Sequence, residues 1–62
     1  MPTPAEIRAT RLAAGLSLRG LARLLGVSGS ARVAEWEAGR RSMSSRTWEL
    51  MRYKLRIHSK SK

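Results

Sequence analysis

Apolar residues recur along the chain at helical spacing, and no segment alternates polar and apolar residues as a strand would. The start of a first helix is predicted at Thr3-Pro4-Ala5-Glu6, where Thr3 can cap the helix and Glu6 can complete a capping box. This helix is expected to run to about Ala14 and to stop at Gly15, because glycine readily adopts a left-handed conformation.

A second helix is predicted after Ser17, whose hydroxyl can cap it. Its apolar face has the spacing i, i+3, i+4 and i+7 and is formed by Leu18, Leu21, Ala22 and Leu25. Gly26 is expected to end this helix, and Val27 to fold back under the turn.

A third helix is predicted to begin with Ser30 as its cap, to end at Gly39, and to place Val33, Trp36 and Glu37 on one face. Residues 40–45 are expected to form a polar loop. A last helix, capped by Ser44 or Ser45, then continues through Trp48, Met51 and Leu55.

These elements predict an all-α fold, a compact bundle of four or five helices. A domain over residues 1–57 is expected, followed by a basic tail over residues 58–62, which lack apolar side chains. A small residue, Ala22, precedes a glycine-containing break and a second short helix, and this order predicts a helix-turn-helix. Its second helix would present Ser30, Ala31, Arg32 and Glu35 to solvent or to a major groove.

Charge narrows the possible functions. The 62 residues include 13 Lys and Arg against four acidic residues, and the formal net charge of +9 is typical of a domain that binds a polyanion. No apolar run approaches the ~20 residues of a membrane span, and no signal peptide is expected. With no cysteine and one histidine, the chain is expected to hold no metal or cofactor. The absence of any nucleophile–base pattern argues against an enzyme.

From residue 6 to about residue 55, the chain resembles the lambda-repressor-like (Cro/C1, XRE-type) helix-turn-helix family. The matching strings are RLAAGLS from Arg11, LARLLGVS from Leu21 and WEAGR from Trp36. The resemblance implies a largely buried, structural ion pair between Arg11 and Glu37.

The chain departs from the family pattern in three places. Its turn is one residue longer, Leu18 replaces a glutamine, and Ser44 stands where proline is common. The longer turn together with the WEAGR string resembles short phage and mobile-element autorepressors, including the anti-CRISPR-associated type.

Base readout is expected from Arg32, because arginine pairs well with guanine; contact with phosphate or solvent is the alternative. Ser30 can contact DNA or only cap its helix, and Ala31 can contact a thymine methyl group or nothing. Glu35 can accept from cytosine or form an ion pair with an arginine.

Contacts to the DNA backbone are expected from Arg19, Ser28, Gly29, Arg40, Arg41, Ser42, Ser44 and Arg46. Arg8 and Arg23 are expected on solvated faces.

Trp36 and Trp48 fit burial better than base stacking, because they share helical spacing with other apolar residues. In the last helix, Trp48, Met51 and Leu55 are expected in the core or at a dimer interface, since the apolar positions there are too widely spread for one stripe.

We therefore expect a homodimeric, sequence-specific repressor of its own gene. It would bind double-stranded DNA at an inverted repeat in a bacterial cytoplasm. An antitoxin-like protein-interaction module and an RNA- or single-strand-binding protein are the alternatives.

Overall fold

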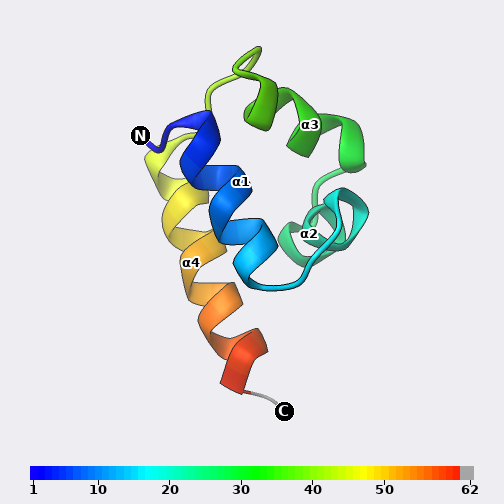
Figure 1. Cartoon of the computed structure of the whole chain (residues 1–62), viewed down its shortest axis with the longest axis vertical. Helices are drawn as coiled ribbons and strands as arrows, with labels where there is room; N and C mark the ends of the chain where they lie inside the picture. Colours follow the sequence, from blue (N-terminus) through cyan, green and yellow to red (C-terminus); the bar gives the residue numbers. More distant parts are fainter. Residues whose placement is uncertain (61–62) are drawn as a thin grey trace.

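The computed structural model describes residues 1–60, with side chains to residue 58, and it confirms the all-α class. Its four helices are α1 (Pro4–Ala13), α2 (Leu18–Leu25), α3 (Ser30–Ala38) and α4 (Ser45–Lys60). Within residues 1–60 there is no strand and no fifth helix. Figure 1 shows α4 toward the left of the view and α2 and α3 toward the right, with the end of α4 extending beyond the remaining helices. Helix α1 packs against α3, and α2 contacts both α3 and α4.

The predicted helix ends are confirmed where side chains or glycines define them. Thr3 and Glu6 form the complete capping box of α1. The hydroxyl oxygen of Ser17 accepts from the Gly20 N–H at 3.0 Å at the start of α2, and Ser44 caps α4 through the Thr47 N–H at 3.1 Å. Left-handed glycines follow the first three helices at positions 15, 26 and 39.

One predicted boundary is wrong. Ser30 is not a cap, because the chain enters α3 through an extended Gly29 (φ 177°), and Ser30 is already the first helical residue. Helix α4 continues to Lys60, so it includes the first three positions of the predicted tail. No glycine or proline follows Gly39, so nothing in the local sequence interrupts this helix. Positions 61 and 62 of the predicted tail lie outside the described residues.

One core forms between the helices, and its buried apolar members are Ile7, Leu21, Ala22, Val33, Trp36, Met43, Met51 and Leu55. Met43 is only 1% exposed, so the prediction of a polar loop over residues 40–45 is wrong at this position. It fills the end of the core beside Ile7 and Trp36. The buried Met43 side chain therefore fixes the connection between α3 and α4 to the core.

Helix α4 is also fixed by a polar contact. Lys54 Nζ donates to the carbonyl oxygen of Leu24 at 3.0 Å, in the last turn of α2. Helix C-termini carry unsatisfied carbonyl groups and a partial negative charge, so a lysine there is favourable. None of the helices among the described residues has the length and apolarity needed to cross a membrane.

Candidate nucleic-acid interface

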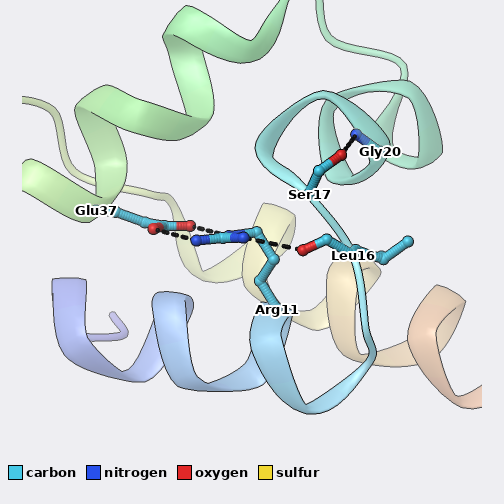
Figure 2. A network of polar contacts seen from close by, with 5 residues as sticks. All are labelled: Arg11, Leu16, Ser17, Gly20 and Glu37. Carbon is cyan, nitrogen blue, oxygen red and sulfur yellow. Dashed lines mark hydrogen bonds and ion pairs between the residues drawn. The ribbon is translucent and has the colours of Figure 1, made fainter.

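A buried ion pair sets the position of α3 against α1. Arg11 Nε donates to Glu37 Oε2 at 2.6 Å, and Nη2 donates to Oε1 at 3.0 Å. The two side chains are 11% and 10% exposed. Figure 2 shows the guanidinium and the carboxylate meeting in this two-point arrangement. The ion pair implied by the family resemblance is therefore present.

The loop after α1 provides a further hydrogen-bond acceptor for the Arg11 guanidinium. Its Nη1 donates to the Leu16 carbonyl oxygen at 2.9 Å (Figure 2). The Leu16 N–H in turn donates to the Arg11 carbonyl oxygen at 3.2 Å. Hydrogen bonding to Glu37 raises the pKa of the Arg11 guanidinium, although burial acts in the opposite direction. Because Ser17 caps α2 directly after Leu16, this contact links α1, α3 and the start of α2.

The connection between α2 and α3 is short and locally determined. Gly26 adopts a left-handed conformation (φ 75°), and the Val27 N–H donates back to the Ala22 carbonyl oxygen at 3.1 Å. Val27 then packs against the core, as predicted. The α2–turn–α3 segment thus packs against the core before, within and after the turn, through Ala22, Val27 and Val33 respectively.

A cleft opens where this turn meets α2. It is lined by Arg19 and Arg23, together with Ala22, from α2, by Val27, Ser28 and Gly29 from the turn, and by Ser30 at the start of α3. The first two are exposed arginines four residues apart, so they lie on the same side of α2. No side chain caps α3, so the amide groups of its first turn have no side-chain acceptor, and Gly29 and Ser30 at this end of the helix line the cleft. Four of the seven lining residues were predicted to contact DNA: Arg19, Ser28, Gly29 and Ser30.

Arg23 is the cleft residue that the sequence interpretation missed. It is exposed, as expected, but it lies beside Arg19 rather than on an unrelated solvated face. The spacing of four residues between the two arginines was the available signal.

The outer face of α3 is dominated by small side chains. Ala31 and Ala34 are exposed there, while Arg32 and Glu35 are half-buried at its sides. Ala34 was not among the predicted residues, although it follows Ala31 by three positions on the same helix face. Within the described part of the chain, the Arg32 side chain has no hydrogen bond or ion pair, so its donors remain available.

At the other end of α3, a second group of cations follows Gly39. Arg41 Nε donates to Glu35 Oε1 at 3.1 Å, in a pair whose side chains are 53% and 41% exposed. Of the two roles considered for Glu35, the ion pair with an arginine is therefore present in the structure. Arg40, Ser42 and Arg46 are exposed nearby. The Ser44 hydroxyl is engaged with Thr47 as a helix cap.

The residues predicted to contact the DNA backbone thus come from two stretches of the chain, one before α3 (Arg19, Ser28 and Gly29) and one after it (Arg40, Arg41, Ser42, Ser44 and Arg46), with the predicted base-readout residues on α3 between them. The two tryptophans belong to neither stretch. Trp36 is 5% exposed in the core, and Trp48 packs against the core with the Arg52 guanidinium 5.9 Å from its ring centre. Among the residues with described side chains, no three His, Cys, Asp or Glu residues are placed to hold a metal ion.

Comparisons of the chain with protein-family models, with curated proteins and with solved structures gave no match.

Proposed function

We propose that this protein is a sequence-specific repressor that binds double-stranded DNA through a helix-turn-helix formed by α2 and α3. The observation that carries the proposal is the cation-lined cleft at the start of α3, together with the second cationic group at its end. In this arrangement α3 enters the major groove, and the two groups bind the phosphates on either side of it.

The surface chemistry of α3 supports this role. Ala31 and Ala34 leave room for the helix to approach base edges closely, and alanine methyl groups can contact a thymine methyl. Arg32 supplies a two-point donor for guanine at the side of that face. The exposed ion pair between Glu35 and Arg41 is weak, so either partner can exchange it for DNA.

Binding to single strands draws less support from the same structure. Such proteins stack bases on exposed aromatic rings. Both tryptophans pack in or against the core, which leaves Tyr53 as the exposed aromatic side chain among the described residues. We therefore assign the basic surface to duplex DNA, and repression to the occlusion of a promoter by the bound protein.

The test is a selection of duplexes from a randomised pool by the purified protein, followed by affinity measurements on the selected site, on random duplex and on single strands. Arg32→Ala should cost about 1–3 kcal/mol on the selected site and relax one base position. Arg40→Ala should weaken selected and random duplexes alike. Arg8→Ala removes the same charge from an exposed position of α1 and serves as the control.

Two results would contradict the proposal. Recovery of no common sequence would exclude specific duplex binding. Equal reductions in affinity for selected and random duplexes in Arg32→Ala would exclude its role in base readout.

A further inference from the structure

Helix α4 carries a second apolar face that the described fold leaves uncovered. Leu50, Tyr53 and Ile57 are 41%, 61% and 47% exposed, whereas Met51 and Leu55 belong to the core. Positions 50, 53 and 57 follow the spacing i, i+3 and i+7, so their side chains form one stripe along the helix. At 3.6 residues per turn this stripe lies roughly opposite Met51 and Leu55. Of the residues predicted to lie in the core or at a dimer interface, Met51 and Leu55 therefore lie in the core.

Two charges of opposite sign flank this stripe on the same edge. Glu49 and Arg56 are both exposed and lie seven residues apart, two helical turns along α4. They also line a groove that continues from Tyr53 to the small residues Ala13 and Ala14 of α1.

Glu49 differs from the other three glutamates. Glu6 is held in a capping box, Glu35 pairs with Arg41, and Glu37 pairs with Arg11. Within the described residues, the Glu49 carboxylate has no ion pair or hydrogen bond. In a chain with 13 cations, the one acid without a partner inside the fold thus lies beside the uncovered apolar stripe.

We propose that a second copy of this chain covers the stripe, with the two α4 helices packed antiparallel about a two-fold axis near Tyr53. In an antiparallel helix pair, flanking positions on the same edge face each other. Glu49 of one copy therefore meets Arg56 of the other, and the two-fold axis forms the same pair a second time. Leu50 lies opposite Ile57 in the same arrangement.

The charge pattern favours a second copy of the chain as the partner and an antiparallel orientation of the two α4 helices. A two-fold interface requires a surface that is complementary to itself, which opposite charges placed symmetrically about the centre of the stripe provide. A parallel pair would instead direct Glu49 toward Lys54, whose ammonium group already donates to the Leu24 carbonyl oxygen. The interface is small, so the dimer should be weak and dependent on concentration.

The test is sedimentation of the full chain without DNA, from micromolar to millimolar concentration. The wild type should show a monomer–dimer equilibrium. Glu49→Arg and Arg56→Glu should each weaken association at least tenfold, because each substitution places two like charges opposite each other. An equimolar mixture of these two variants should recover association as a heterodimer, since both cross-pairs are then attractive.

Ile57→Lys should also abolish the dimer, with Leu12→Lys as its matched control, because Leu12 is 54% exposed on α1 outside the stripe. Circular dichroism establishes that each variant is helical at the measured temperature. A wild type that stays monomeric to millimolar concentration would overturn the proposal. So would a mixture of the charge variants that fails to associate, or an equal effect of Leu12→Lys and Ile57→Lys.

Discussion

Arg11 shows how one side chain can organise a small fold. Its guanidinium contacts the Glu37 carboxylate at two points and the Leu16 carbonyl oxygen at a third, while only 9% of the residue is exposed. No buried side-chain nitrogen or oxygen lacks a partner in the described part of the chain. A buried charge is tolerable only when it is paired and hydrogen-bonded, and these contacts meet that condition.

Removal of the Glu37 charge should therefore be costly. We expect Glu37→Gln to lower the free energy of unfolding by about 3–5 kcal/mol, because it leaves the Arg11 charge buried without a counterion. Glu35→Gln removes an exposed pair and should cost less than about 1 kcal/mol. Urea unfolding monitored by circular dichroism measures both. Similar destabilisation in the two variants would show that burial does not strengthen the Arg11 pair.

Among the elements, α3 is the one whose start is least stabilised. Thr3, Ser17 and Ser44 cap the other three helices with side-chain oxygens, whereas Gly29 offers none. Gly29 is extended, and a Cβ added there would meet nothing within 4 Å, so a residue with a side chain fits. The amide groups left uncapped lie beside Arg19 and Arg23, where the proposed function places a DNA phosphate.

This position should separate stability from binding. We expect Gly29→Ser and Gly29→Asp to raise the free energy of unfolding by a few tenths of a kcal/mol each, because both supply the missing cap. Gly29→Asp should also weaken duplex binding markedly, since its carboxylate occupies the place proposed for phosphate. Thermal unfolding and duplex titration measure the two effects. Unchanged affinity in the aspartate variant would exclude a phosphate from this cleft.

In the molecule as a whole, apolar side chains fill the interior and most charged side chains lie at the surface. The buried residues form one cluster to which all four helices and the connection after α3 contribute. Arg11 is the single buried cation among the residues with described side chains, so the other arginines in this part of the chain remain at least partly exposed. A surface of this charge attracts a polyanion from any direction, and the shape of the α2–α3 segment must then select the binding geometry.

Binding to duplex DNA should accordingly depend steeply on salt. The logarithm of the association constant should fall linearly with the logarithm of salt concentration, because each neutralised phosphate releases a counterion. We expect the double variant Arg19→Ala/Arg23→Ala to reduce this slope by about two, because each arginine is expected to neutralise one phosphate. Arg8→Ala should leave the slope unchanged. Titrations at several salt concentrations give the slopes, and equal slopes for all three proteins would remove the cleft from the interface.

Local signals determined much of this fold. The capping box at Thr3, the serine caps at Ser17 and Ser44 and the left-handed glycines act over four or five residues, so they were readable from the chain. The apolar spacing of Val33 and Trp36 correctly predicted the buried face of α3. The pairing of Arg11 with Glu37 spans 26 positions, and it was anticipated through the family resemblance rather than through spacing.

Only the tertiary structure decided how surfaces that are distant in sequence are used. Met43 is buried although its neighbours in the sequence are polar, because it packs at the end of the core beside Ile7 and Trp36. The tertiary structure also placed Arg23 beside the start of α3 and separated the two apolar faces of α4 into a core side and an uncovered side. Sequence alone determined the helix ends that a side-chain cap or a left-handed glycine defines, because those interactions are local, whereas the uncapped start of α3 was placed wrongly. Packing determined which faces are buried, since that depends on contacts between helices.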